Sequence, residues 1–473
     1  MSLTPERRAR IRRERTFFGI LLLLVCIFAG GVTWYDRWLD EGNRLDTTYI
    51  PQKTPITPAI LRLQEYVRID TSHQNEIDGA RWIATQLRSE QIPYEIVESA
   101  PGRANIWARI RGKQHGDGLL LASHIDVVPA SPAGWTRPPF SAEIYLNQIW
   151  GRGTLDMKSI TICQLEAFLA LARTHQQPEH DVVFLAVADE ESGSAYGMRW
   201  IVEHRRDVLD GIRYALNEGG VTETLAGRIT YFGIEIGTKQ LITYDLVAPT
   251  QGQLQKARIS LEPYFGTGDA DLVLPEVVRY LHDIAPFRLE PRDDLMDVSR
   301  TIREGNLWRL PRPYRELVQN IVWAGPVRKE SDHWAMRTSL MSLPSVQPEP
   351  RIEWLRKQVE PFGVSMGPKL FDDPVARLSS DRTMLYELIR GVVRKRYNVS
   401  VGSQVLAKSG NDSRFLRPLG IECYGMWPFP VDFYQTEGIH AVDERVRADW
   451  FQSGVDVTKE IVKTYSVSTQ PAG

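Results

Sequence analysis

Three apolar segments of this chain are each followed at once by side chains that can bind a metal ion or accept a proton. These side chains are His124 and Asp126 after GLLLAS, Asp189, Glu190 and Glu191 after VVFLAVA, and Glu218 after RYALN. Open α/β sheets bind their ligands where strands end, so three such strands would bring these groups to one sheet edge. A single histidine after a strand is more often only hydrogen-bonded, and adjacent acids are more often a surface cluster. Their recurrence after three segments favours a shared site.

Two further residues extend this candidate site. Asp156 ends the loop GRGTLD just before a helical pattern, and His440 lies in EGIHAVDERV, far along the chain. An acid before a helix can simply cap it. The glycines beside Asp156 let the backbone fold closely around its side chain. A carboxylate presented in this way can bridge two cations.

The chemistry of this set points to a pair of zinc ions, with cobalt or manganese as substitutes. Two histidines, three carboxylates and a spare glutamate are available, without thiolates, which suits a catalytic rather than a structural site. Two divalent ions bring four positive charges, and three carboxylates with one hydroxide bring four negative ones. One of two adjacent acids can then be a ligand while the other takes a proton from water.

In these motifs the chain resembles the two-zinc exopeptidases that include carboxypeptidase S, aminoacylase, glutamate carboxypeptidase and succinyl-diaminopimelate desuccinylase. SHIDVVP, GRGTLDMKS, ADEES, NEGG and GIHAVDERV are similar to that family's five metal-site motifs, in order, over residues 58–238 and 372–466. NDSRFLRPLGIECYG is similar to the carboxypeptidase S and aminoacylase branch.

The resemblance implies a role for each residue of the site. Asp156 would bridge both zinc ions, with His124 and Glu218 completing one and Glu191 and His440 the other. Glu190 would be the general base, and Asp126 would brace His124. Arg414 would lie near a substrate carboxylate, which suits its planar fork, and a surface salt bridge is the alternative.

The chain departs from the family pattern between residues 239 and 371. Family members usually carry a GHSS-like histidine there, which reaches an active site, often that of a partner subunit, so a homodimer is a candidate assembly. Here the corresponding stretch, LVAPTQGQLQKARISLEPYFGTG, has no histidine. His282 and His333 are candidate substitutes, and a structural or solvated role is the alternative for each.

Short apolar runs alternate with helical patterns along the chain, which predicts an α/β fold: a mixed sheet with helices on both faces. We expect residues 56–238 and 372–473 to form the catalytic domain. Residues 239–371 would form an inserted, smaller α+β lid or dimerisation-like domain.

The first 55 residues predict a membrane anchor. Residues 1–16 are a basic tail, residues 17–35 are an uncharged run long enough to span a bilayer, and residues 36–55 read as a stalk. The arginines before the run predict a cytoplasmic N-terminus and a catalytic body on the outer, periplasmic or lumenal, side. A cleaved signal peptide is the alternative, and a lipoprotein is a weaker one.

The nearly balanced charge, with 57 lysines and arginines against 59 acids, gives no reason to expect a nucleic-acid partner. The sequence predicts a zinc-dependent hydrolase that cleaves the amide bond next to a free carboxylate, in a peptide or an N-acyl amino acid. The rival hypotheses are an aminopeptidase and a catalytically weak or inactive zinc-binding protein at the membrane.

Overall fold

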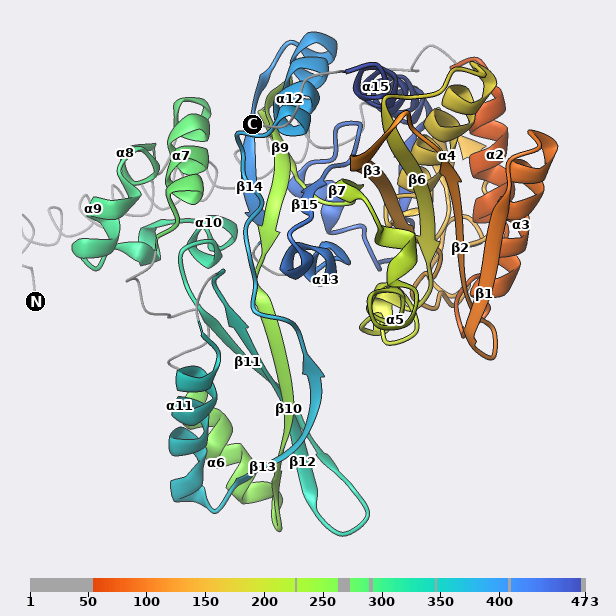
Figure 1. Cartoon of the computed structure of the whole chain (residues 1–473). Helices are drawn as coiled ribbons and strands as arrows, with labels where there is room; N and C mark the ends of the chain where they lie inside the picture. The colour runs from red at the N-terminus through yellow and green to blue at the C-terminus, as the bar shows by residue number, and fades with distance from the viewer. Residues whose placement is uncertain are drawn as a thin grey trace, which may run out of the picture. The chain divides into compact units, whose positions relative to one another are not determined.

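A large mixed sheet organises the computed structural model of this protein, which describes residues 54–225, 228–262, 273–288, 292–344, 347–406 and 410–468 (Figure 1). Its strands, in spatial order, are β1 (Tyr94–Ala100), β2 (Arg103–Ile110), β6 (His180–Val187), β3 (Gln114–His124), β7 (Ile212–Asn217), β15 (Glu422–Gly425), β9 (Arg228–Thr238) and β14 (Ser400–Leu406), with β8 (Thr222–Leu225) paired to β9. The central strands β6, β3, β7 and β15 are parallel to their neighbours in that group. Their carboxyl ends therefore share one edge.

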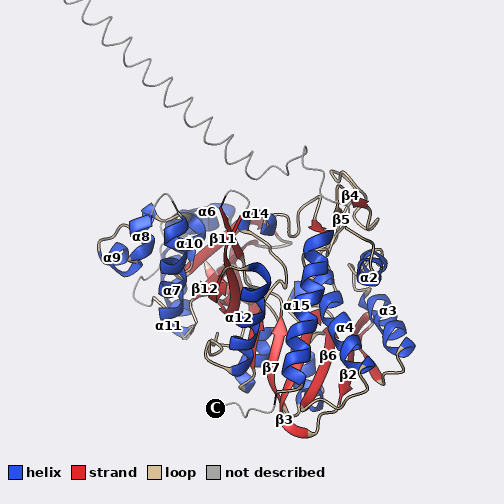
Figure 2. Cartoon of the chain, turned by 90° about the horizontal axis from the view of Figure 1, so that it is seen from above, coloured by secondary structure: helices blue, strands red, loops and turns tan. Residues whose placement is uncertain are grey.

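Both faces of this sheet are buried, which explains why its central strands are continuous apolar runs. Side chains alternate across a strand, so Leu119 and Leu121 of β3 enter one core cluster while Leu120 and Ala122 enter another. The helices whose apolar side chains join the first cluster are α2 (Pro58–Val67), α3 (Glu76–Ser89), α4 (Lys158–Arg173), α12 (Met384–Tyr397) and α15 (Ala448–Ser466) (Figure 2). The second cluster contains side chains of α5 (Met198–His204) and α13 (Ser413–Leu416). The prediction of a mixed α/β sheet with helices on both faces is confirmed.

A second, four-stranded antiparallel sheet lies within residues 240–372. Its order is β11 (Ile321–Lys329), β12 (Trp334–Ser342), β10 (Gln240–Ala248) and β13 (Ser365–Asp372). Two helices, α6 (Gln251–Leu261) and α11 (Glu349–Val359), pack on one face and form a core cluster with it (Figure 1). That this segment acts as a lid stays a prediction.

Four short helices lie between the strands of this second sheet in the chain: α7 (Pro275–Ile284), α8 (Arg292–Met296), α9 (Val298–Arg303) and α10 (Arg312–Glu316). Their buried side chains, among them Tyr280 and Leu295, join the first core cluster of the large sheet. The segment 239–371 therefore contributes to two cores, one of its own and one shared with the large sheet.

A small three-stranded sheet of β4 (Ile144–Tyr145), β5 (Gln148–Trp150) and β16 (Arg445–Arg447) brings distant loops together. Arg445 pairs with Trp150 across it, so the loop that follows β5 meets the loop that precedes β16. The short helix α14 (Phe433–Thr436) leads into that second loop. These two loops carry Asp156 and His440.

The predicted membrane localisation requires a correction. Among the residues that the structure describes, no helix is both long and apolar enough to span a bilayer. The predicted tail, anchor and stalk fall on residues 1–55, of which only 54 and 55 are described. The membrane placement and its outer-side topology therefore lose their structural support.

Candidate metal centre

The predicted metal ligands meet at the carboxyl edge of the parallel strands. His124 ends β3, Glu191 follows β6, and Glu218 follows β7. Because β3 pairs in parallel with both neighbours, with His124 opposite Val187 of β6, the three chain segments leave the sheet together. The local reason is the apolar strand, which buries its length and ends where the polar side chains begin.

The ring of His124 is buried and held at both nitrogens. Its Nδ1 lies 2.9 Å from the carbonyl oxygen of Asp126, and since a carbonyl can only accept, Nδ1 donates. Nε2 then has its lone pair for a ligand, and it lies 3.0 Å from Oδ1 of Asp156. The predicted brace for His124 thus comes from the Asp126 backbone.

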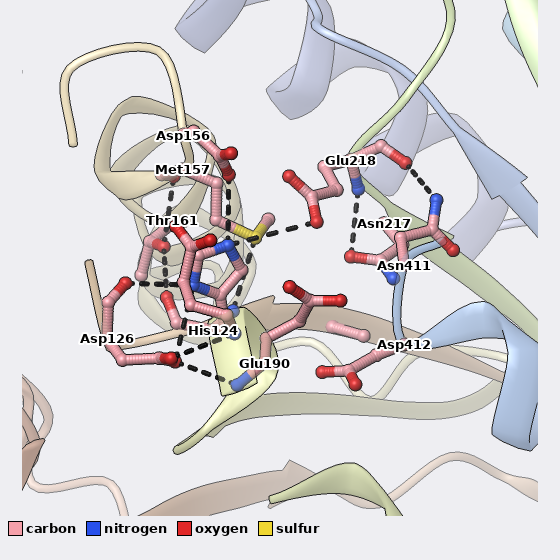
Figure 3. A network of polar contacts seen from close by, with 12 residues as sticks. His124, Asp126, Asp156, Met157, Thr161, Glu190, Asn217, Glu218, Asn411 and Asp412 are labelled. Atoms are coloured by element: carbon pink, nitrogen blue, oxygen red, sulfur yellow. Dashed lines mark hydrogen bonds and ion pairs between the residues drawn. The ribbon is translucent and has the colours of Figure 1, made fainter. Parts of the chain in front are cut away.

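The carboxylate of Asp126 holds the acidic loop after β6. Its two oxygens accept hydrogen bonds from the backbone N–H groups of Glu190, at 3.1 Å, and Glu191, at 3.0 Å. Figure 3 shows this carboxylate beside His124 and below the loop that carries Glu190. One residue therefore sets both the histidine and the backbone of the neighbouring acids.

Asp156 lies between two histidines. Its Oδ1 faces Nε2 of His124 at 3.0 Å, and its Oδ2 faces Nε2 of His440 at 3.2 Å. The peptide bond that follows Asp156 is cis. Each oxygen of this carboxylate is thus next to a different imidazole, which is the arrangement that a bridging ligand needs.

Five side chains form two groups that share Asp156. One group is His124, Asp156 and Glu218, and the other is Asp156, Glu191 and His440. Within each group the candidate ligand atoms lie within 4.8 Å of one another. The structure therefore brings together all five predicted ligands, with imidazole and carboxylate donors only, which suits a pair of divalent transition-metal ions.

The electrostatics of this cluster favour bound cations. Burial raises the pKa of Glu191 to about 7, and the neighbouring carboxylate of Asp156 adds to the rise. The same two causes raise the pKa of Glu218. Hydrogen bonds to Asp156 and Glu191 raise the pKa of His440 to about 10. Without cations these carboxylates repel one another in a poorly solvated site, and divalent ions would remove that cost.

Glu190, the predicted general base, belongs to neither group of ligands. Its Oε1 lies 2.8 Å from Nη1 of Arg414. Its carboxyl group and that of Glu218 point toward the same space (Figure 3). A carboxylate beside the metal ligands but outside their groups remains available to accept a proton.

Arg414 is buried and already paired. Besides Glu190, its guanidinium faces Asp373, with 3.1 Å between Nε and Oδ1. The side chain is only 6% exposed. That Arg414 binds a substrate carboxylate stays a prediction.

Sequence reasoning missed a buried pair that ties the two ligand loops together. Glu444 accepts hydrogen bonds from three backbone amides of the loop that ends at Asp156, at 2.7 to 3.2 Å. It also pairs with Arg152 at 2.6 Å, and Arg152 donates to the carbonyl oxygen of His440 at 3.1 Å. The only signal in the sequence was that Glu444 lies four residues after His440.

The two candidate lid histidines lie in exposed positions. The side chain of His282 on α7 is 55% exposed beside Asp283, and that of His333, between β11 and β12, is 41% exposed beside Asp332. Neither belongs to the two ligand groups found among the described residues.

Comparisons with known proteins agree with this architecture. The sequence model of the protein family described as Peptidase family M20/M25/M40 matches residues 120–464. The succinyl-diaminopimelate desuccinylase of Blochmanniella floridana is 30% identical over 161 residues, which are 33% of this chain and 42% of that protein. The protein of the same name from Aromatoleum aromaticum is 35% identical over 122 residues, 26% of this chain and 31% of that protein. The chain thus aligns with less than half the length of these relatives.

Solved structures share the fold at low identity. The M20 family metallo-carboxypeptidase Sso-CP2 from Sulfolobus solfataricus has a TM-score of 0.67 at 18% identity, covering 87% of this chain and 100% of that one. The di-peptidase Dug1p from Saccharomyces cerevisiae has a TM-score of 0.63 at 14% identity, covering 87% and 96%. Human carnosine dipeptidase 1 has a TM-score of 0.62 at 13% identity, covering 86% and 96%.

Proposed function

This chain belongs to peptidase family M20/M25/M40, and from that premise we propose that it hydrolyses amide bonds with a pair of metal ions. The expected enzyme class, a metallopeptidase or amidohydrolase, is confirmed by the family. The specific activity proposed is that of a metallocarboxypeptidase or N-acyl amino acid amidohydrolase, cleaving the amide bond next to a free carboxylate.

One observation carries the proposal: Asp156 faces a histidine with each carboxylate oxygen and belongs to both ligand groups. We propose that His124, Asp156 and Glu218 hold one ion and that Asp156, Glu191 and His440 hold the other. Zinc is the proposed metal because imidazole and carboxylate donors suit it, although cobalt and manganese fit the same donors.

In this proposal the chain's own residues move the proton and fix the geometry. The bound ions would polarise the scissile carbonyl and make water acidic enough to lose a proton near neutral pH. Glu190 takes that proton and delivers it to the leaving amine. Asp126 keeps the backbone of Glu190 in place through the hydrogen bond to its N–H.

The substrate class rests on the names of relatives and on one motif. The similar proteins are named as desuccinylases, a metallo-carboxypeptidase and dipeptidases. NDSRFLRPLGIECYG supports a place near carboxypeptidase S and aminoacylase. We therefore propose peptides or N-acyl amino acids as substrates.

A substrate panel tests this function. The full chain, loaded with zinc, should hydrolyse some of a set of N-acetyl and N-succinyl amino acids and dipeptides. Activity should disappear with a chelator and return with zinc. Amidation of the free carboxylate should abolish cleavage, and amidated substrates cleaved equally well would refute the carboxylate requirement. A zinc-loaded protein that cleaves no member of the panel would argue for the inactive zinc-binding protein instead.

A further inference from the structure

Arg414 lies between the acidic loop of the metal centre and the start of the second sheet. Its Nη1 contacts Oε1 of Glu190 at 2.8 Å, and its Nε contacts Oδ1 of Asp373 at 3.1 Å. The guanidinium carbon lies 4.8 Å from the ring centroid of Phe415 and 5.8 Å from that of Phe371. Aromatic rings beside a buried guanidinium restrict where it can move.

The third guanidinium nitrogen also faces a protein oxygen. Nη2 of Arg414 lies 3.4 Å from Oγ of Ser194, which itself donates a hydrogen bond to the carboxylate of Asp412. Each nitrogen of the guanidinium therefore has a protein oxygen as its neighbour. A substrate carboxylate would have to displace one of these neighbours.

Asp373 connects Arg414 to the joint of the second sheet. Its Oδ2 accepts a hydrogen bond from the backbone N–H of Leu241, and its own N–H donates to the carbonyl oxygen of Leu241, both at 3.0 Å. Leu241 lies at the start of β10, and Asp373 directly follows the end of β13. The residue that anchors Arg414 thus also fixes the place where the second sheet begins and ends.

Glu190 is consequently held at both of its ends. Asp126 accepts a hydrogen bond from its backbone N–H at 3.1 Å, and Arg414 binds its carboxylate. A glutamate side chain otherwise has several rotatable bonds and loses much of its freedom only when both ends are fixed. The planar fork of arginine can fix the direction of a carboxylate, which a lysine ammonium does less well.

We propose that Arg414 is a positioning residue, which holds the carboxylate of Glu190 toward the metal ligands and ties it to the joint formed by Leu241 and Asp373. This inference rests on the proposed function and deepens it, since it gives Arg414 a role that acts through the general base. It differs from binding of a substrate carboxylate, which the sequence predicted for the same residue.

The first test separates the two roles by kinetics. Arg414→Met should lower kcat for N-acetyl-L-leucine by about 10- to 100-fold with little change in KM, a smaller loss than that of Glu190→Gln. Arg414→Lys should recover part of this loss, and Asp373→Asn should lose less than Arg414→Met. A rise in KM with kcat unchanged would overturn the proposal.

A matched control removes a buried arginine elsewhere. Arg109 of β2 is 13% exposed and pairs with Asp181 at 2.5 Å, near the opposite end of β6 from the acidic loop. Arg109→Met also leaves a buried carboxylate without its main partner, so it reports the general cost of such a change. An equal fall in kcat for Arg109→Met and Arg414→Met would show that Arg414 acts only through stability.

The second test needs no turnover. In the Glu190→Gln background, Arg414→Met should leave the Kd of N-acetyl-L-leucine unchanged by calorimetry, whereas a weaker Kd would assign Arg414 to the substrate. Urea unfolding of the metal-free proteins needs no ligand at all. The effects of Glu190→Gln and Arg414→Met should then be non-additive, because the two side chains are direct partners. Additive effects would overturn the proposal even if the chain proved inactive on every substrate.

Discussion

At the scale of single residues, Asp156 and Glu190 divide the work of the site. Asp156 has a histidine beside each of its oxygens, whereas Glu190 lies outside both ligand groups and has Arg414 as its partner. The two carboxylates therefore have the same chemistry but different surroundings. Their surroundings suit one for binding cations and the other for moving a proton.

Glu190→Gln should keep the metal ions and lose most of the turnover. The amide has nearly the shape of the carboxylate but cannot accept the proton of the attacking water, and general base assistance is worth on the order of 10²- to 10⁴-fold. Initial rates and metal content of the same preparation measure this. Glu203→Gln, at an exposed position on α5, is the control and should change neither. A Glu190→Gln protein with most of its kcat would show that another group is the base.

Zinc affinity should increase as the pH rises. Ligands bind metal after losing their protons, and the raised pKa values of Glu191, about 7, and His440, about 10, mean that both are protonated below pH 7 in the metal-free site. Binding should then release two protons below about pH 7 and one between about 7 and 10. Competition titrations against a chelator at several pH values measure the slope. An affinity that is constant from about pH 6 to 8 would contradict the assigned ligands.

At the scale of elements, the site depends on loops that are far apart in the sequence. Glu444 follows His440 but binds the backbone of Asp156, 288 residues earlier. The pairing of β16 with β5 brings the two loops together, and the buried pair of Arg152 and Glu444 fixes them. A metal centre whose bridging ligand sits on such a loop should be sensitive to this pair.

Glu444→Gln should weaken metal binding by roughly 10- to 100-fold, a typical cost of losing a residue that orients a ligand. The amide keeps one acceptor oxygen but loses the charge that holds Arg152. Glu166→Gln is the control, because Glu166 is equally buried and pairs with Lys459 and Arg62 away from the ligand loops. Similar losses of zinc affinity in both variants would show that the effect is one of general stability.

The candidate lid histidines should not contribute a transition-state donor. His282 and His333 are exposed and each has an adjacent aspartate as partner. Alanine variants of either should keep kcat within about twofold, whereas losing an oxyanion donor typically costs on the order of 10²- to 10³-fold. A drop of that size in one variant, with its metal content unchanged, would identify that histidine as the missing donor.

The sequence was informative wherever a functional residue directly follows its own strand. His124, Glu191 and Glu218 each follow a buried apolar run, so both the sheet and its ligand edge could be predicted. Glu444 and Asp373 could not, because their roles arise from contacts between loops that only the folded chain brings together. For the same reason the sequence could not predict that Arg414 is buried against two carboxylates.

At the scale of the whole molecule, the family match and the fold agree. Residues 120–464 match the family, and the structures of three related peptidases share the fold. The membrane localisation predicted from residues 1–55 is the exception, since no helix among the described residues could span a bilayer. The account of function therefore rests on the folded part of the chain and on its metal centre.

Counting metal ions in the full chain tests the central claim most directly. After incubation with zinc and removal of the excess, elemental analysis should find two ions per wild-type chain. His440→Ala should retain about one, because His440 belongs to a single ligand group, whereas Asp156→Ala should lose both, because Asp156 belongs to both groups. Two ions retained in Asp156→Ala, or none bound by the wild-type protein, would contradict the shared metal centre.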